Sequence, residues 1–251
     1  MEQNKVNSVI LLTATVDVRG VSFMQRVDPS VRLKDYERAL KWWLSNPHTP
    51  ELIFCENSGY DLSSLAKICK EQNPYNKKVE LFSFDDNNYQ RTLGKGYGEI
   101  RTIAYALEHS KLINPDTMVF KITGRYYIAN IKDMIQSIQR STKAEIYCNL
   151  QNNLTWSDSR IFCASVLFLK KFLLPMQETA DDTHGVYIEH VVCRAAHLCM
   201  AQGLRWALLP CYLDIRGVSG TSGVTYGSSI FSRIRRFIFH YLKKFILRIN
   251  A

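Results

Sequence analysis

The segment from Ser8 to Val16 is a nearly continuous run of apolar and β-branched residues. Such a run is typical of a strand that is buried on both faces, as in a parallel sheet. Similar short runs lie at 51–55, 79–84, 118–122 and 144–148, and segments with helical periodicity separate them at 33–44, 62–68 and 99–112. This regular alternation predicts βαβ units. We therefore expect an α/β fold with a mostly parallel central sheet and flanking helices.

The alternation becomes looser after about residue 155. One more strand is predicted at 162–168, and helices are predicted near 169–179 and 187–201. No internal repeat and no linker rich in Pro, Gly or Ser divides this region. We therefore expect a single domain at 1–227, long enough to be a catalytic domain, and a separate tail at 228–251. The polar N-terminus lacks the features of a secretion signal, and no apolar run is long enough to span a bilayer.

The tail holds most of the net positive charge. The whole chain has 32 basic and 23 acidic residues, a net charge of +9. Six of the basic residues and none of the acidic ones lie at 228–251, which leaves +3 for residues 1–227. A nucleic-acid-binding protein would more often carry its charge across a folded face, so we do not expect a nucleic-acid partner.

The tail also has the pattern of an amphipathic helix. At 100° per residue, its large apolar side chains fall on an arc about 160° wide, with basic residues opposite. A helix of this kind is suited to the head-group region of an anionic membrane. Packing on the body or on a second subunit is the alternative, but such a helix would not need a wholly cationic polar face. The residues expected at the membrane are Arg233, Arg235, Arg236, Lys243, Lys244 and Arg248. We expect a cytoplasmic protein, peripheral on the inner face of the cell membrane.

Polar residues follow four of the predicted strands, at 13–17, 56–59, 85–88 and 123–127. Ligands bind beyond the carboxyl ends of strands in open α/β sheets, so these segments indicate a site. The glycine-rich segment 94–98 is expected to lead into the helix at 99–112, where Lys95 and the helix N-terminus would favour phosphate. Its spacing fits neither a Walker loop nor a dinucleotide fingerprint. A flexible loop with a helix cap is the alternative.

Two further cations and several acids are candidates. Lys121 and Arg125 flank a strand end and could neutralise a diphosphate, although ordinary surface charge is the alternative. Glu189 has apolar neighbours and could act as a general base, or could simply face solvent on a helix. Asp182 could also act as a general base, or it could cap a helix. The segment 214–223, which contains Arg216, could be a phosphate-binding lid or a connector to the tail.

The seven cysteines form no C-x-x-C pair. Buried free thiols in a reducing compartment account for them better than disulfides or zinc. No Cys/His cluster has the spacing of a structural zinc site, so no metal-ligating residues are predicted.

Taken together, several segments resemble a known family. They are the strand-first α/β body, GKGYGE at 94–99, KITGRY at 121–126, DSR at 158–160 and GVYIEH at 185–190. In these the chain resembles small bacterial glycosyltransferases of lipopolysaccharide, capsule or O-antigen synthesis, which have a GT-A-like nucleotide-sugar fold. The resemblance covers most of residues 8–223. It implies transfer of a sugar from a nucleotide-sugar donor to a membrane-linked glycan acceptor, by an inverting displacement.

The chain departs from that family at its metal motif. GT-A enzymes usually carry Asp-x-Asp to hold a divalent ion on the donor diphosphate, whereas the corresponding strand end here reads Thr123-Gly124-Arg125. The segment 85–87 (Asp-Asp-Asn) is the nearby substitute. The resemblance allows for Mg²⁺ or Mn²⁺, but we do not expect a metal, because Lys95, Lys121, Arg125 and Arg216 could replace it as counter-charges for the leaving nucleotide.

The resemblance also implies roles for individual residues. Donor binding falls to Thr13, Ala14, Asp17, Glu56, Asn57, Lys95, Gly98, Lys121, Thr123, Arg125 and Arg216. The acceptor would be deprotonated by Glu189 or, failing that, Asp182, and would be bound by Asp158, Arg160 and His184. The alternative function is a non-catalytic membrane-surface adaptor, in which the tail binds lipid and the body binds a protein partner.

Overall fold

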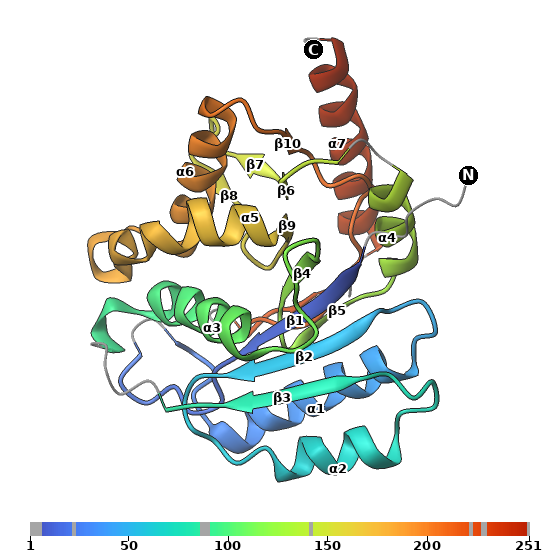
Figure 1. Cartoon of the computed structure of the whole chain (residues 1–251), viewed down its shortest axis with the longest axis vertical. Coiled ribbons are helices and arrows are strands. Elements are labelled where there is room, and N and C mark those ends of the chain that lie inside the picture. Colours follow the sequence, from blue (N-terminus) through green and yellow to red (C-terminus); the bar gives the residue numbers. More distant parts are fainter. Residues whose placement is uncertain are drawn as a thin grey trace.

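A seven-stranded sheet forms the centre of the molecule, in the order β10-β6-β9-β4-β1-β2-β3 (Figure 1). The computed structural model describes residues 7–21, 24–85, 91–140, 143–220, 223–226 and 230–249. The strands of this sheet are β1 (Ser8–Ala14), β2 (Glu51–Glu56), β3 (Val79–Ser83), β4 (Met118–Thr123), β6 (Ile146–Tyr147), β9 (Ile161–Ser165) and β10 (Trp206–Ala207). β1 pairs in parallel with β2 and β4, as do β2 with β3 and β6 with β10. Only β9 among these strands runs antiparallel to its neighbours β4 and β6. The expected α/β class with a mainly parallel sheet is confirmed.

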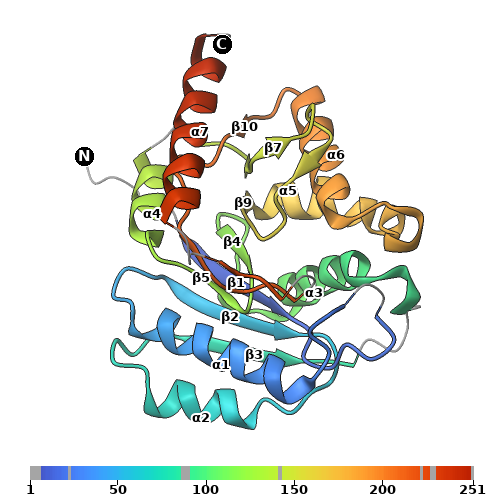
Figure 2. The same ribbon diagram turned by 180° about the vertical axis from the view of Figure 1, so that it is seen from behind.

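Helices cover both faces of the sheet, as Figures 1 and 2 show. On one face lie α1 (Pro29–Ser45), α2 (Ser63–Glu71) and α4 (Ile131–Arg140), and on the other lie α3 (Lys95–His109), α5 (Val166–Phe168) and α6 (Ile188–Ala201). β1 is buried between the two layers, with Ile10 and Leu12 in one core cluster and Val9 and Leu11 in the other. This burial on both faces explains the uninterrupted apolar run in the sequence.

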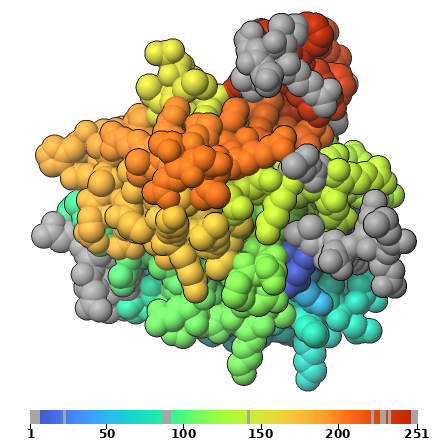
Figure 3. Space-filling view, turned by 45° about the horizontal axis from the view of Figure 1, so that its top comes forward, coloured from blue at the N-terminus to red at the C-terminus, as the bar shows by residue number. Residues whose placement is uncertain are grey.

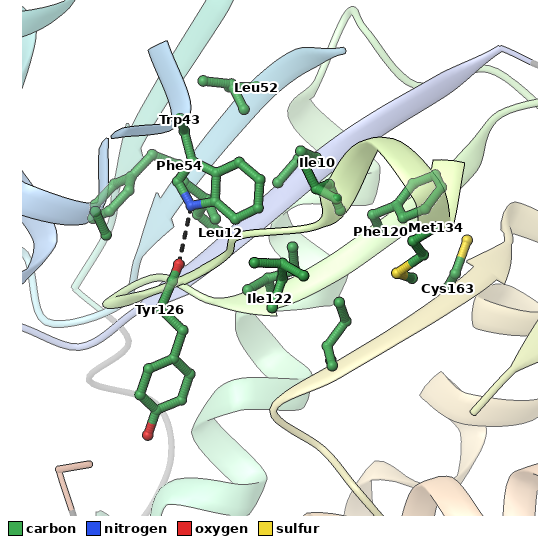
Figure 4. Packing of buried hydrophobic residues seen from close by; sticks show 14 of the residues in the cluster. Ile10, Leu12, Trp43, Leu52, Phe54, Phe120, Ile122, Tyr126, Met134 and Cys163 are labelled. Carbon is green, nitrogen blue, oxygen red and sulfur yellow. Dashed lines mark hydrogen bonds between the residues drawn. The ribbon is translucent and has the colours of Figure 1, made fainter. Parts of the chain in front are cut away.

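One core cluster holds the strand ends in place. Trp43 of α1 packs on the sheet beside Ile10, Leu12 and Ile122 (Figure 4). Its indole N–H donates to the carbonyl of Tyr126 at 3.0 Å, directly after the turn that carries Arg125. The buried indole therefore fixes the backbone from which Arg125 projects.

The glycine-rich segment differs from its prediction. α3 begins at Lys95, four residues earlier than expected, so Gly96 and Gly98 lie inside the helix. A Cβ on Gly96 would come within 2.9 Å of the Asp182 carboxylate and of the backbone nitrogen of Ile188. Gly96 therefore allows the close approach of α6 and of the short 3₁₀ helix η4 (Asp182–His184), and the segment does not form an open phosphate-binding loop.

The segment after β9 is helical where strand was expected. The strand ends at Ser165 and α5 begins at Val166, followed by a π turn η2 (Leu169–Leu173) and a 3₁₀ helix η3 (Leu174–Thr179). The Ser165 hydroxyl accepts the backbone N–H of Phe168 at 3.0 Å and so caps this new helix. A further 3₁₀ turn, η1 (Arg91–Leu93), precedes α3.

Two small antiparallel sheets lie beside the main one. β5 (Tyr126–Ile128), β11 (Ile215–Val218) and β12 (Thr225–Tyr226) form one, and β7 (Leu150–Gln151) and β8 (Trp156–Ser157) form the other. The segment 214–223, predicted to be a lid or a connector, therefore begins as a strand. Gly220 follows it, and its carbonyl accepts the backbone N–H groups of Gln25 and Arg26 at 3.3 and 3.2 Å.

The tail forms the predicted helix, α7 (Ile230–Ile249), which stands at one end of the molecule (Figures 1 and 3). The large apolar side chains that the structure describes between Phe231 and Ile246 are exposed, from Phe231 at 87% to Tyr241 at 41%. Within the described residues, no helix is long and apolar enough to span a membrane. All seven cysteines are free, and burial raises the pKa of those such as Cys148 to about 11.

Candidate active site

An inner cavity of about 60 Å³ lies beyond the carboxyl ends of β1 and β4. Seven of the eleven residues expected to bind the donor line it: Thr13, Ala14, Asn57, Lys95, Gly98, Thr123 and Arg125. Residues that the sequence did not single out complete the wall, among them Arg32, Tyr36 and Glu99. The carboxyl ends of neighbouring strands converge here, as they do at ligand sites of open α/β sheets.

Arg125 is the most unusual side chain of this cavity. The residue is only 9% exposed, and within the described chain its Nε and Nη1 have no hydrogen-bond partner. Burial lowers the pKa of Arg125, but Tyr36, Tyr126 and Glu99 together outweigh this effect. The pKa of Arg125 is therefore raised, and the guanidinium is charged. A Cβ on Gly220 would come within 2.6 Å of the guanidinium, so the loop after β11 packs directly on it. Buried donors without partners are rare in folded proteins, and they are satisfied when an anion binds.

A second buried guanidinium lies next to it. Nε and Nη2 of Arg32 donate to the carbonyl of Thr15 at 2.9 and 2.6 Å, and Nη1 donates to the carbonyl of Arg26 at 3.0 Å. Burial lowers the pKa of Arg32, and the positive charge of Arg125 lowers it further. The printed hydrogen-bond partners of Arg32 are all neutral oxygens, and the nearby Asp35 carboxylate offsets only part of the effect of burial on its pKa.

Lys121 lies beneath the cavity and does not line it. The residue is 0% exposed; its Nζ is 2.5 Å from Glu99 Oε1 and donates to the Ser159 carbonyl at 2.6 Å. Glu99 also accepts the Thr13 hydroxyl at 2.7 Å. Burial raises the pKa of Glu99, but Lys121 and Thr13 outweigh it, so the pKa is lowered. The expected role of Lys121 as a direct counter-charge is therefore corrected, because its ammonium is already paired with Glu99.

Glu99 is a site residue that the sequence analysis missed. It lies one helical turn after Lys95 on α3, and both line the cavity. The spacing of four residues places two side chains on the same face of a helix, and this signal was available in the sequence.

An outer cavity of about 410 Å³ adjoins the inner one and shares Lys95, Glu99, Thr123 and Arg125 with it. Glu189 lines it from the first turn of α6, and Glu189 Oε1 accepts the Ser159 hydroxyl at 2.7 Å. Glu189, one of the two predicted bases, therefore faces the same space as the two cations Lys95 and Arg125.

The predicted acceptor residues Asp158 and Arg160 also line the outer cavity. They pair with each other, with Nε of Arg160 at 2.8 Å from Asp158 Oδ1. Burial lowers the pKa of Arg160, but Asp158 raises it by more, so the pair is ionic. The guanidinium also lies over the ring of Tyr226, 4.9 Å from its centroid. A planar cation held in this way is suited to hydroxyl and phosphate oxygens.

Three predicted donor residues lie apart from both cavities. Asp17 pairs with Arg19 at a separate cavity, and Arg216 pairs with Asp214 at 3.0 Å. The carboxylate of Glu56 accepts three backbone N–H groups, from Val16 and Ser58 at 2.9 Å and from Tyr60 at 3.0 Å. That carboxylate orders the turn after β2 and has its oxygens occupied.

Asp182 and His184 also differ from their predicted roles. Asp182 accepts the backbone N–H of Lys95 at 3.0 Å and so caps α3, which was the alternative to a catalytic base. Burial raises the pKa of Asp182, and Lys95 partly offsets this. The side chain of His184 is 82% exposed and pairs with Asp181. Neither residue lines the two cavities.

The donor set of the cavities does not fit a divalent metal ion. In the part of the chain that the structure describes, no group of three or more His, Cys, Asp or Glu side chains could hold one. Two of the three carboxylates near the cations are in ion pairs, Glu99 with Lys121 and Asp158 with Arg160, while Glu189 accepts the Ser159 hydroxyl. Asp86 and Asn87 of the substitute motif lie outside the described residues.

No protein-family model matches the sequence, and no curated protein matches it. Solved structures resemble the fold. A mannosyltransferase from Pyrobaculum calidifontis in complex with GDP-Man and Mn²⁺ is 12% identical, with a TM-score of 0.49 over 95% of this chain. The chain spans 64% of that enzyme's length.

Two further structures are equally distant. A cytidylyltransferase from Leptospira borgpetersenii is 13% identical, with a TM-score of 0.48 over 89% of this chain and 82% of its own. The glycosyltransferase GlyE from Streptococcus pneumoniae is 10% identical, with a TM-score of 0.45 over 82% and 45%. Likenesses this distant identify neither a substrate nor a reaction for this chain.

Proposed function

We propose that this protein is a sugar transferase that uses a nucleotide-sugar donor. The observation that carries the proposal is the buried guanidinium of Arg125, whose Nε and Nη1 have no partner in the described chain, in a cavity that also holds Lys95 and Arg32. Glu99 is the carboxylate of that cavity, and it is paired with Lys121. The two unsatisfied N–H groups of the buried Arg125 guanidinium call for an anionic ligand, and a diphosphate matches a guanidinium fork.

Different parts of the donor would occupy the two cavities. The inner cavity, at about 60 Å³, has the size of a phosphate group rather than a nucleoside, so we place the diphosphate there. The nucleoside would lie towards Thr13, Ala14 and Asn57, where the apolar wall formed by Val18 and Met24 must move aside. The outer cavity, at about 410 Å³, has the volume of an ordinary small-molecule site and would hold the sugars.

The same groups account for an inverting displacement. The acceptor hydroxyl attacks the anomeric carbon of the donor, the bond from that carbon to the diphosphate oxygen breaks, and the proton passes to Glu189. Lys95 and Arg125 neutralise the departing diphosphate. Ser159 holds Glu189 in place and is itself held through its carbonyl by Lys121, so these two residues position the base.

We further propose a membrane-linked glycan as the acceptor and the cytoplasmic face of a membrane as the place of reaction. The exposed apolar side chains of α7, such as Phe231, Phe239 and Phe245, support this. A patch of this kind marks an interaction surface. The role in bacterial surface-polysaccharide synthesis that the family resemblance implies belongs to the same proposal.

A non-catalytic adaptor is the second candidate, because the exposed face of α7 would serve it equally well. A thermal-shift panel over UDP, GDP, CMP and dTDP sugars, each with and without Mn²⁺, separates the two. A transferase is stabilised by its donor nucleotide, by about 2.7 kcal/mol at a hundredfold excess over Kd. The absence of a shift with every nucleotide would leave the adaptor as the better account.

A further inference from the structure

One aromatic side chain of the outer cavity has no part in the chemistry described so far. Three aromatic residues line this cavity, Tyr126, Trp156 and Tyr226. Tyr126 is buried, and the guanidinium of Arg160 lies over the ring of Tyr226, 4.9 Å from its centroid. Trp156 is half-buried, and among the described residues no cation lies over its indole. The indole is therefore the aromatic wall of the cavity that is left for a ligand.

The rings that touch the indole of Trp156 are steeply inclined to it. Its centroid lies 5.9 Å from that of Tyr187 at an interplanar angle of 61°, and 4.8 Å from that of His190 at 83°. In the part of the chain that the structure describes, no aromatic ring therefore lies parallel to the indole. A flat aromatic face that borders a cavity and is not stacked against the protein can pack on the C–H bonds of a ligand.

The same two rings flank Glu189 in the sequence. Tyr187 is the N-cap of α6, and His190 lies in its first turn, where its Nδ1 accepts the backbone N–H of Tyr187 at 3.2 Å. Glu189 and Trp156 both line the outer cavity. One short segment, 187–190, thus carries the proposed base and holds the indole, so the position of one relative to the other is fixed.

The β7–β8 hairpin that carries the indole has a strained turn. Asn152, Asn153 and Leu154 have left-handed backbone conformations, with φ of 49°, 55° and 61°. Asparagine tolerates this conformation, whereas leucine rarely adopts it. Strain of this kind persists only where the surrounding structure fixes the backbone, and it is concentrated at functional sites.

Helix α6 fixes this turn with the face that carries the base. The carbonyl of Leu154 accepts the thiol of Cys193 at 2.9 Å and Nε2–H of His197 at 2.8 Å. Glu189, Cys193 and His197 are each four residues apart, so they share one face of α6. The hairpin is thus attached to α6 at its tip and again at Trp156, and the indole is held in place before any ligand arrives.

We propose that the indole of Trp156 is the platform on which the acceptor sugar stacks, and that this sugar is a pyranoside with an unbroken apolar face. The proposal rests on the proposed function and names the acceptor class. Lys95 and Arg125 bind the donor diphosphate, whereas Glu189 takes the proton of the acceptor, so the platform beside Glu189 belongs to the acceptor. In β-glucosides and β-galactosides three axial hydrogens project from one side of the ring and form such a face.

The test follows the indole N–H signals of the whole chain, labelled with ¹⁵N at its four tryptophans, by NMR. The signal of Trp156 is assigned by its loss in Trp156→Phe. Methyl β-D-glucopyranoside and methyl β-D-galactopyranoside should shift this signal, with a Kd on the order of 1 mM for ligands of this size. Trp42, Trp43 and Trp206 line neither cavity, and their signals should stay in place.

Methyl β-D-allopyranoside is the matched probe. It has the composition of the glucoside, but a hydroxyl replaces one of the three axial hydrogens of the apolar face. We expect it to bind about tenfold more weakly, because that hydroxyl would be pressed against the indole without a hydrogen-bond partner. Equal affinity for the glucoside and the alloside would overturn the proposal. So would shifts of the other indole signals as large as that of Trp156.

Variants test the platform from the side of the protein. Saturation transfer to the protons of the glucoside measures binding without the Trp156 signal. Trp156→Ala should weaken binding about tenfold or more through the lost apolar contact, whereas Trp156→Phe keeps a ring and should keep most of the affinity. The control Trp206→Ala removes another half-buried indole, on β10, and should bind as the wild type does. Undiminished binding by Trp156→Ala, or an equal loss in Trp206→Ala, refutes the platform. If Trp156→Ala does not fold, the comparison of glucoside with alloside in the wild type still decides.

Nucleotide-induced stabilisation separates this proposal from the proposed function. It reports on the Arg125 cavity and should be the same in Trp156→Phe as in the wild type. A protein that binds the glucoside at Trp156 but responds to no nucleotide keeps the sugar platform and loses the transferase. A protein that a nucleotide stabilises, and whose Trp156 signal no glycoside moves, keeps the transferase and loses the platform.

Discussion

Replacing Arg125 with methionine should leave the ligand-free protein at least as stable as the wild type while abolishing its response to nucleotides. In the ligand-free protein Nε and Nη1 are buried without partners in the described chain. Each unsatisfied buried donor costs about 1–3 kcal/mol, so removing two of them offsets the loss of the charge and of the guanidinium contacts. Methionine keeps an unbranched stem of similar length, which limits the loss of packing.

The effect on binding has the opposite sign. Two charge-assisted hydrogen bonds to a diphosphate contribute about 1.5–3 kcal/mol each. Their loss weakens nucleotide binding by about 10²–10⁴-fold, since 1.4 kcal/mol corresponds to tenfold. Arg125→Lys keeps the charge without the planar fork, so its affinity for the nucleotide should lie between that of the wild type and that of Arg125→Met.

The assay is thermal unfolding with and without the nucleotide that stabilises the wild type. A change of 1 kcal/mol moves the Tm of a domain of this size by about 2–4 °C. Arg140→Met, an exposed position on α4, is the matched control and should keep the full nucleotide shift. If Arg125→Met unfolds several degrees earlier without ligand and still shows the full shift, Arg125 has a structural role and the reasoning is wrong.

Three more outcomes are expected. Glu189→Gln should lower sugar-transfer turnover by about 10²–10⁴-fold with the nucleotide-induced shift intact; undiminished turnover would remove Glu189 as the base. Glu99→Gln leaves the buried Lys121 unpaired and should lower the free energy of unfolding in urea by about 3–5 kcal/mol, and adding Lys121→Met should restore most of it. Burial lowers the pKa of folded His240 to about 4, below its unfolded value, so the unfolded state binds more protons between these pKa values. Stability should therefore fall as the pH drops from about 6.5 to about 4, and His240→Asn should remove that part of the slope in thermal unfolding at a series of pH values.

The sequence was enough to predict most of the sheet. A strand buried on both faces needs apolar side chains at every position, and β1 shows this in Val9–Leu12. The antiparallel β9 has the same burial, so its apolar run does not reveal its direction. The glycine at 96 was misinterpreted because the reason for it is tertiary. Gly96 makes room for Asp182, a residue 86 positions further along the chain.

The site was predictable where it follows from topology. Thr13, Asn57 and Thr123 line a cavity because the carboxyl ends of neighbouring strands converge. Pairing is not visible in a sequence, so Lys121 was expected at the cavity surface although Glu99 holds it below. Arg32 could not be recognised either, because its acceptors are backbone carbonyls of Thr15 and Arg26.

Gly220 joins three parts of the molecule by main-chain and van der Waals contact. Its backbone lies against the Arg125 guanidinium, its carbonyl anchors Gln25 and Arg26, and it belongs to the stretch that leads towards α7. Any shift of the Arg125 guanidinium towards an incoming anion therefore changes its packing against Gly220. Linkage requires that any ligand which changes the position of this glycine changes the affinity for an anion at Arg125 in equal measure.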